Sequence, residues 1–216
     1  MTPGARVRIG LASDSYGNVD PLERAFEQFQ RAQVDRVFFL GGRAADVDAV
    51  LARRGGGSRR APIPQTDGEF LTAVRGALAR QALATRDPLD GHIVRVASRA
   101  CPEYESGKVA RKQVDLLEGW IGCLVHDRAD LSRDDIANAA LLFHGNSAAA
   151  GIVQIGPRCF VTPGHLRASA PEGRPATFAI AEVTQHELVL TVFSEQCTEL
   201  RQDRVRLGSS GKMTVR

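Results

Sequence analysis

The sequence predicts an α/β protein with two sheets packed together, because its pattern changes near residue 150. Before that point, short apolar runs alternate with amphipathic segments, which is typical of strands joined by helices. After Gly151, short β-like runs follow each other with turn signals between them, which is typical of antiparallel strands. A chain of 216 residues can bury a real core. We expect one domain over residues 1–207 and a disordered tail over 208–216.

The chain begins with a predicted strand–helix–strand unit. Val7–Ala12 is a short apolar run and is predicted to be a buried strand. A helix is expected to start at Asp20, which can cap it, with Pro21 in the first helical position and Glu23 at N3. Val37–Leu40 is a second buried strand, so the two strands should be parallel. One apolar face of the helix is formed by Leu22, Ala25, Phe26 and Phe29.

A helix, a loop, a second helix and a strand are expected over residues 44–97. Ala44–Arg53 has a helical pattern, and Ile93–Ala97 is predicted to be the third strand. Residues 54–65 are rich in glycine and arginine and are expected to form a mobile surface loop. A phosphate-binding or RNA-binding loop has a similar composition, but a solvated loop is the favoured interpretation. Thr66 and Glu69 form a possible capping box for a helix through residue 78.

The rest of the chain is predicted to contain one more amphipathic helix, a short helix and six strands. The apolar residues Ala110, Val114, Leu117 and Ile121 are spaced as in a helix, which is expected to run into a strand over 122–125. Ser132 is expected to cap a short helix over 134–138. The other predicted strands span 139–143, 152–155, 159–162, 177–183 and 187–193.

Composition excludes several classes of function. The net charge of +3 is small and gives no reason to expect general nucleic-acid binding. No run of 18 apolar residues exists, so no membrane span is expected. Residues 1–10 have no apolar segment typical of a signal peptide. The four cysteines are widely spaced, which favours buried reduced thiols in a cytoplasmic protein.

Polar loops follow the predicted strands, and such loops usually line the site of an α/β protein. In order, they resemble the motifs of the calcineurin-like metallophosphoesterases, particularly the small bacterial phosphodiesterases: D-x-H-G-N, G-D, G-N-H/C-D, H-G, G-H-T-H and N-P-G-S. The resemblance covers about residues 6–195 and implies a two-sheet αββα sandwich. The loops are Asp14–Asn18, Gly41–Asp46, Ser98–Tyr104, His126–Asp127, His144–Ser147 and Thr162–His165.

The family uses these motifs to hold two metal ions, which need carboxylate, imidazole and amide ligands and a bridging carboxylate. Asp14 matches the first aspartate, and Gly17–Asn18 matches the pair that follows it. Tyr16 replaces the first histidine, and Gly42 replaces the bridging aspartate. Ala100 replaces the asparagine ligand. A glycine at the bridge leaves no charge there to balance two dications.

The later motifs are partly retained. His126 matches the histidine of H-G. In one register of residues 144–147, Gly145 and Ser147 replace both histidines of G-H-T-H. In the other register, His144 is the first histidine and Asn146 takes the place of the second, and the sequence leaves both registers open. Thr162–His165 matches N-P-G-S. Asp46 could in principle reach back to the bridging position, although this is the less favoured alternative.

The resemblance therefore implies a vestigial cleft, with no catalytic residue, metal or other cofactor expected. Asp14 is expected to bind loop amides, and Tyr16 is expected to fill the emptied site with its ring. His126 and His144 could hold one weak metal with Asp14, but satisfied histidines are the favoured interpretation. His165 could contribute to a new polar pocket. The cleft residues are Asp14, Tyr16, Asn18, Gly42, Ala100, His126, His144, Asn146 and His165.

These changes favour a catalytically inactive metallophosphoesterase-like protein that binds a protein partner as a scaffold or regulatory module. The small retromer subunit resembles these phosphodiesterases and gives the fold a precedent in that role. One alternative is a residual metal-dependent phosphodiesterase or phosphatase with a rebuilt site. Another is a sensor that binds a phosphate-containing ligand without cleaving it. Two contact surfaces are considered, an apolar patch on the second sheet and the predicted helix that carries Lys108, Arg111 and Lys112.

Overall fold

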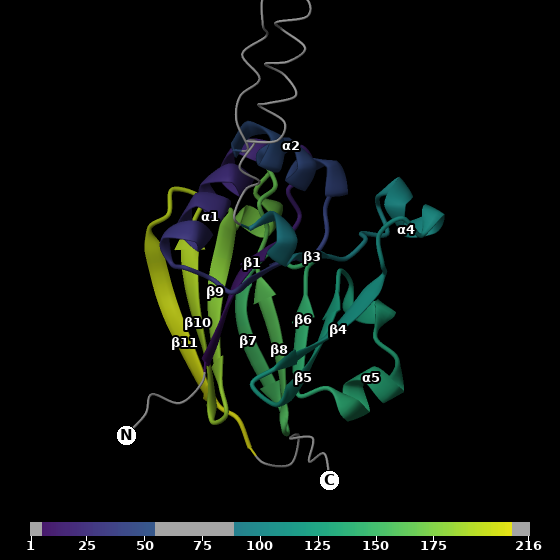
Figure 1. Ribbon diagram of the computed structural model, residues 1–216, viewed down its shortest axis with the longest axis vertical. Helices are drawn as coiled ribbons and strands as arrows, with labels where there is room; N and C mark the ends of the chain where they lie inside the picture. Colours follow the sequence, from purple (N-terminus) through teal and green to yellow (C-terminus); the bar gives the residue numbers. More distant parts are fainter. Residues whose placement is uncertain (1–5, 55–88, 209–216) are drawn as a thin grey trace, which may run out of the picture.

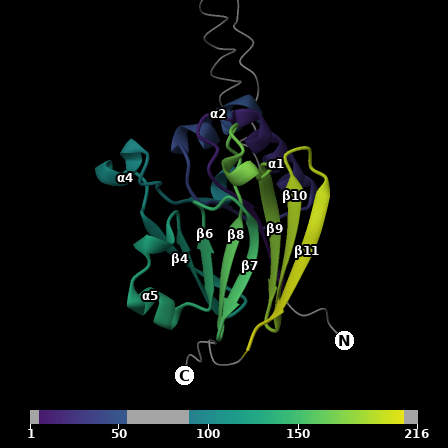
Figure 2. The same cartoon turned by 180° about the vertical axis from the view of Figure 1, so that it is seen from behind.

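The computed structural model describes residues 6–54 and 89–208, which form two sheets packed face to face (Figure 1). The first sheet has six strands in the order β11-β10-β9-β1-β2-β3, and the second has five in the order β4-β5-β6-β8-β7. Helices α1 and α2 cover the outer face of the first sheet, and the short helix α5 lies beside the second (Figures 1 and 2). This architecture confirms the predicted two-sheet α/β sandwich.

The first sheet combines a parallel half with an antiparallel half. Strand β1 pairs in parallel with β2, and β2 pairs in parallel with β3. On its other side β1 pairs antiparallel with β9, and β10 and β11 continue the antiparallel part. The strands are β1 (Arg6–Ala12), β2 (Arg36–Phe39), β3 (Ile93–Arg95), β9 (Thr177–Thr184), β10 (Glu187–Ser194) and β11 (Glu199–Arg206).

Helix α1 (Val19–Arg31) is the crossover between β1 and β2. Its apolar residues Leu22, Ala25, Phe26 and Phe29 are fully buried, as predicted. The predicted cap was wrong, because the N-cap position is Asn18 and Asp20 lies within the first turn. The Asn18 side chain does not cap the helix, since its amide donates to the carbonyl of Leu166 at 2.8 Å.

Helix α2 (Ala44–Arg54) confirms the predicted helix and extends it by one residue. Arg54, which was assigned to the following loop, therefore belongs to the helix. The Arg53 guanidinium lies 2.9 Å from both Asp20 and Glu23 of α1, and these ion pairs hold the last turn of α2 on its neighbour. The remainder of the predicted 54–65 loop and the predicted helix over 66–78 lie outside the described residues.

The second sheet has five strands, and the pairs at its centre are parallel. Strand β6 pairs in parallel with β5 and with β8, whereas the two outer pairs, β4–β5 and β7–β8, are antiparallel. Its strands are β4 (Lys112–Leu117), β5 (Trp120–Val125), β6 (Leu141–His144), β7 (Ala150–Ile155) and β8 (Arg158–Pro163). The remaining elements are α4 (Pro102–Ser106), α5 (Arg133–Asn138), η1 (Asp90–His92), η2 (Arg128–Asp130) and η3 (Pro171–Gly173).

The helix predicted through residues 110–121 is wrong, because this segment is the β4–β5 hairpin. Glu118 and Gly119 both have positive φ values, of 51° and 87°, as in the two-residue turn that joins twisted antiparallel strands. Leu117 is buried between the sheets, whereas Val114 is 62% exposed. The apolar residues that share a face in a helix of this sequence therefore lie on opposite faces of the strand.

The Ser132 cap was predicted correctly, whereas strand β11 was missed. Ser132 caps α5 with a complete capping box, in which its hydroxyl accepts from the Asp135 N–H and the Asp135 carboxylate accepts from the Ser132 N–H. Strand β11 was not predicted, because its residues are mostly charged and alternate too weakly. Charged side chains are common on the outermost strand of a sheet, where they discourage pairing with other chains.

Apolar side chains fill the space between the sheets. The largest cluster includes Ile9, Phe38, Trp120, Phe143 and Leu190, all almost completely buried. A second cluster packs α1 against the outer face of the first sheet, and a smaller one lies on the outer face of the second. All four cysteines have free thiols, and Cys101, Cys123 and Cys159 are buried. Across residues 6–54 and 89–208, no helix has the length and apolar character needed to cross a membrane.

Candidate functional site

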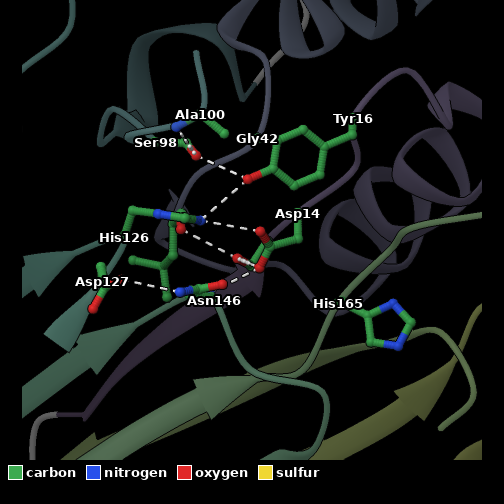
Figure 3. A network of polar contacts seen from close by, with 12 residues as sticks. Asp14, Tyr16, Gly42, Ser98, Ala100, His126, Asp127, Asn146 and His165 are labelled. Atoms are coloured by element: carbon green, nitrogen blue, oxygen red, sulfur yellow. Dashed lines mark hydrogen bonds and ion pairs between the residues drawn. The ribbon is translucent and has the colours of Figure 1, made fainter. Parts of the chain in front are cut away.

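The polar loops predicted to form a site meet at the carboxyl ends of β1, β2, β5 and β6 (Figure 3). Backbone hydrogen bonds join these loops directly. The Asp14 N–H donates to the Gly41 carbonyl at 2.8 Å, and the Leu166 N–H donates to the Ser13 carbonyl at 2.9 Å. We call the group formed by Asp14, Tyr16, Ser98, His126, Asn146 and Arg167 the Asp14 cluster.

Asp14 is the centre of this cluster and is completely buried. Its Oδ1 accepts from His126 Nε2 and from Arg167 Nη2, each at 3.0 Å. Its Oδ2 accepts from the Ser13 hydroxyl at 2.7 Å and from the Asn146 N–H at 2.9 Å. A carboxylate has about four lone-pair positions, and these four donors use all of them. Two of the four are side chains that the sequence analysis did not assign to the site, Ser13 and Arg167.

The charge of Asp14 is balanced inside the protein. Burial alone raises the pKa of this carboxyl, but the hydrogen bond and the charge of His126 oppose burial, and hydrogen bonds from Ser13 and Arg167 add to them. Together they lower the pKa of Asp14 to about 2. Asp14 is therefore ionised at neutral pH, with a guanidinium in direct contact.

Tyr16 lies beside this carboxylate on the same loop. Its hydroxyl is 2.8 Å from the Ser98 hydroxyl and 3.5 Å from His126 Nε2 (Figure 3). The Arg167 guanidinium lies over its ring, 4.9 Å from the ring centroid. Burial raises the pKa of Tyr16, so the hydroxyl stays protonated. Asp14 and Tyr16 both have positive φ values, of 58° and 44°, which is uncommon for residues with a side chain.

The His126 ring packs directly on Gly41, and this close contact is possible because Gly41 has no side chain. A Cβ on Gly41 would come within 1.9 Å of the His126 ring, and Gly41 has a φ of 111°. Because a carboxylate only accepts, His126 Nε2 carries the proton toward Asp14. The other ring nitrogen, Nδ1, is buried without a hydrogen-bond partner among the described residues.

The positions of the expected bridging and amide ligands contain no metal-binding side chain. A Cβ on Gly42 would lie 3.0 Å from the Ser15 nitrogen and 3.1 Å from its hydroxyl, and Gly42 has a φ of 109°. Ala100 contributes only its N–H, which donates to the Ser98 hydroxyl at 3.3 Å. Asp46 does not approach Asp14 as a substitute bridge. Its Oδ2 accepts from the Ser15 hydroxyl at 2.6 Å and the Gly17 N–H at 2.8 Å, which fixes the loop.

The 144–147 loop brings Asn146, rather than His144, to Asp14. His144 Nδ1 donates to the neighbouring Gly145 carbonyl at 2.9 Å, and burial lowers the pKa of this histidine. Asn146 approaches Asp14 through its backbone N–H, while its side-chain amide donates to Asp127 at 3.0 Å. In either register of the family motif, no imidazole of this loop contacts Asp14.

His165 holds backbone rather than lining the cluster, and Figure 3 shows it apart from Asp14. Its Nδ1 accepts from the Arg167 N–H at 3.2 Å, and its Nε2 lies 3.3 Å from the Arg174 carbonyl. Burial lowers the pKa of His165, which favours the neutral ring that this pair of bonds needs. Asn18 likewise binds the Leu166 carbonyl. Both residues therefore help position the loop that delivers Arg167.

Arg167 is the main residue of the site that the sequence interpretation missed. It lies just beyond the N-P-G-S-like motif, where the family pattern names no ligand. A signal was available in principle, because a buried ionised aspartate needs a cation or several hydrogen-bond donors beside it. The chain has 28 lysines and arginines, so the sequence does not single out Arg167 as that cation.

This arrangement does not fit a dinuclear metal centre. The four lone-pair positions of Asp14 are occupied, and the bridging position has no carboxylate. Within residues 6–54 and 89–208, no three His, Cys, Asp or Glu side chains come together as metal ligands. A guanidinium beside Asp14 would also repel a bound dication.

Comparisons with known proteins identify the fold. No protein-family model and no curated protein matches the chain. A predicted phosphoesterase from Streptococcus pneumoniae is 16% identical, with a TM-score of 0.60, and the match covers 94% of this chain and 99% of that one. The phosphoesterase YfcE from E. coli is 19% identical, with a TM-score of 0.54 and coverage of 91% and 98%.

A third similar structure is Vps29 from Chaetomium thermophilum, which is 15% identical, with a TM-score of 0.57 and coverage of 93% and 97%. These matches span nearly the whole of each chain, and the identities are low enough that they bear on the fold alone. The chain therefore has the fold of the calcineurin-like metallophosphoesterases, as the order of its loop motifs predicted.

Proposed function

We propose that this chain is a catalytically inactive metallophosphoesterase-like protein that acts by binding another protein. The observation that carries the proposal is the saturated carboxylate of Asp14. Phosphoester hydrolysis by this fold needs metal ions that polarise the phosphate and activate a water. In this chain the retained aspartate binds Arg167, His126, Ser13 and a backbone N–H instead.

The rebuilt surroundings support the same conclusion. Restoring an aspartate at residue 42 would press its Cβ on the Ser15 backbone, in a conformation that favours glycine. The Tyr16 hydroxyl lies between Ser98 and His126, where it closes the cluster as a plug. The glycine at residue 42 and the hydrogen bonds of Tyr16 are thus compatible with each other. Such mutual consistency is expected of a site reorganised for stability rather than left unfilled.

A binding role is supported by the fold of similar proteins. Vps29 from Chaetomium thermophilum, whose fold is similar with a TM-score of 0.53, was solved in complex with a cyclic peptide. Vps29 from Entamoeba histolytica, at a TM-score of 0.51, was solved with zinc, so the fold by itself permits both peptide binding and metal binding. The contacts of Asp14 are what favour the non-metal role for this chain.

Metal analysis combined with a hydrolysis assay tests this proposal. Purified chain is incubated with Mn²⁺ or Zn²⁺, desalted and analysed by mass spectrometry for metal, and then assayed with bis(p-nitrophenyl) phosphate. We expect substoichiometric metal and a rate equal to that of the Asp14→Ala variant. About two metal ions per chain, or hydrolysis that Asp14→Ala and His126→Ala abolish, would establish the residual enzyme instead.

A thermal-shift arm separates the phosphate-sensor alternative from the scaffold. A ligand that binds only the folded state raises the melting temperature in proportion to the logarithm of its concentration. We expect inorganic phosphate and nucleotides to leave the melting temperature unchanged. An increase that grows with ligand concentration and is lost in Arg167→Gln would favour the sensor and contradict the scaffold.

A further inference from the structure

The outer face of the second sheet exposes apolar side chains at both of its edges. On β4, Val114 is 62% and Leu116 is 60% exposed, and on β7, Val153 is 57% and Ile155 is 61% exposed. The centre of the same face is covered, because Cys123, Val125 and Leu142 are buried in the small third cluster. The two edges therefore offer similar side chains, and the difference between them is in the backbone.

The first sheet covers the start of the β7 edge, at Ala150 and Gly151, whereas no described residue covers the β4 edge in the same way. Arg201 of β11 donates to the Ala150 carbonyl and lies against Gly151. Strand β4 has β5 as its one neighbour among the described strands. The two-residue turn makes Leu117–Trp120 a hydrogen-bonded pair. Hydrogen-bonded and non-hydrogen-bonded pairs alternate along an antiparallel ladder. The N–H and carbonyl groups of Lys112, Val114 and Leu116 consequently point away from β5.

One contact at this edge agrees with that assignment. The Leu116 N–H donates to the Asp115 carboxylate at 2.8 Å instead of to β5. The N–H groups of Lys112 and Val114 have no comparable cover in the described part of the chain. Edge strands in natural proteins usually carry charges or bulges that prevent pairing, as β11 does. On β4, Val114 and Leu116 are exposed and the N–H groups of Lys112 and Val114 face outward, which suits this edge to pairing.

The charges along this strand run from basic to acidic. Lys108, Arg111 and Lys112 lie at its start, and Asp115 and Glu118 lie at its end. Two copies of such a strand that run antiparallel place the basic start of each beside the acidic end of the other. Parallel pairing would set like charges together, which is destabilising. Lys112 and Asp115 already pair within the chain, with Asp135 and Arg36, so Lys108, Arg111 and Glu118 are the charges left to favour the antiparallel sense.

We propose that β4 pairs antiparallel with β4 of a second copy of this chain, about a two-fold axis at Val114. This register places Val114 opposite itself, Gln113 opposite Asp115 of the second copy, and Lys112 opposite Leu116 of the second copy. The Lys112 ammonium is held on Asp135 at 2.8 Å, so its aliphatic stem can lie along that leucine. A register shifted by one residue would set Asp115 against Asp115. The two five-stranded sheets then form one continuous sheet.

The contact is self-complementary, as a two-fold interface must be, and it is small. Pairing of one short strand buries less than the roughly 1,000 Å² of a stable interface, so the dimer should be weak and dependent on concentration. This inference names one partner for the proposed binding role. It does not depend on whether the Asp14 cluster hydrolyses phosphate, because the readouts below are mass and cross-linking.

Disulfide trapping tests the register directly. Residues opposite each other in a hydrogen-bonded antiparallel pair have Cα atoms about 5.5 Å apart, which a disulfide can span. Under mild oxidation we expect Val114→Cys to form a disulfide-linked dimer on a non-reducing gel. The matched control is Val153→Cys, which has similar exposure at the opposite end of the same sheet and should remain monomeric. Equal cross-linking of the two variants, or none of Val114→Cys, would overturn the proposal.

Sedimentation velocity over a concentration series tests the dimer without an added cysteine. We expect a reversible dimer of the full chain that Val114→Glu abolishes, because two glutamates would face each other at the axis, and that Val153→Glu preserves. Leu116→Glu gives a second variant in case one change alters folding. A wild-type chain that stays monomeric at every concentration, or a Val114→Glu chain that dimerises as the wild type does, would refute self-pairing and leave this edge to a strand of another protein.

Discussion

The Asp14 cluster and the β4 edge differ in how many of their polar and apolar groups have partners within the chain. At the cluster, a buried carboxylate has four donors, and one of them is a cation from a loop 153 residues further along the chain. At the edge, Val114 and Leu116 are more than half exposed, on a strand that has one neighbour among the described strands. The comparison indicates that the hydrogen-bonding groups of the Asp14 carboxylate are satisfied within the chain, while the β4 edge leaves apolar side chains exposed.

The largest expected effect comes from removing the carboxylate at the centre of the cluster. Asp14→Ala leaves Arg167 and His126 without their partner, and breaking a buried ion pair in this way costs about 3 kcal/mol of unfolding free energy. Urea denaturation measures the change. Asp48→Ala is the control, because its carboxylate is 66% exposed in an ion pair with Arg95 and should contribute less than about 1 kcal/mol.

An Asp14→Ala variant as stable as the wild type, or more stable, would contradict the internal balance of charge. It would show that Asp14 is an uncompensated ligand, and the metal experiment would then be expected to succeed. In that case the comparison between a closed cluster and an open edge would fail at the cluster.

The parts of the fold that depend on buried apolar faces and helix caps were predictable from the sequence. The Val7–Ala12 strand, the Phe26 and Phe29 face and the Ser132 cap were all correct, because burial and capping leave periodic or local signals. The β4–β5 hairpin was missed because Val114, Leu117 and Ile121 also fit a helical period. Glu118–Gly119 carried the contrary signal, since glycine in a two-residue turn favours a hairpin.

The site was predictable only as a set of positions. The loops that contain Asp14, His126 and Asn146 do meet, because parallel strands place their carboxyl ends at one edge. The partners were not predictable, since Arg167 and Ser98 reach the cluster through tertiary packing and match no motif. His165 and Asp46 are buried polar residues near the site whose hydrogen bonds go to backbone and loop groups, and no spacing in the sequence distinguishes that use from ligation.

The second prediction is that the lost bridging ligand cannot be restored by one change. Gly42→Asp places a Cβ 3.0 Å from the Ser15 nitrogen at a φ of 109°, so we expect a loss of about 2 kcal/mol of unfolding free energy. Gly91→Asp is the matched control, because no described atom lies within 4 Å of its Cβ and its φ is not in the left-handed region. Urea denaturation compares the two.

The same variant addresses activity when it is combined with Tyr16→His. We expect no hydrolysis of bis(p-nitrophenyl) phosphate in manganese, because Arg167 still occupies Asp14 and Ala100 supplies no ligand. A stable double variant that hydrolyses the ester would mean that the cluster remains close to a working metal site.

The third prediction concerns acid. The pKa of Asp14 is lowered from 3.8 to about 2, so its contribution to stability is present above pH 3.8 and is lost as the pH falls toward 2. A shift of that size corresponds to about 2 kcal/mol. We expect the unfolding free energy of the wild type to fall by this amount more than that of Asp14→Asn over the interval.

Arg167→Gln sharpens this result. Without the guanidinium, the pKa of Asp14 should rise, and the loss of stability should begin at a higher pH than in the wild type. Carbon NMR of the Asp14 carboxyl follows the titration directly. An unchanged midpoint would assign the lowered pKa to His126 and Ser13 alone and would remove Arg167 from its role as the replacement cation.

The smallest expected effect is at the β4 edge, where Val114→Glu should leave stability nearly unchanged. The Val114 side chain is 62% exposed, so replacing it removes little buried surface. The unfolding free energy should therefore change by no more than about 0.5 kcal/mol. Val153→Glu should behave in the same way, and urea denaturation at low protein concentration measures both. A loss above 1 kcal/mol would mean that Val114 is part of the folded core of the monomer, and the edge would then be no freer than the cluster. Equal stability with unequal association is the result that distinguishes a surface kept for binding from one that merely tolerates exposed apolar residues.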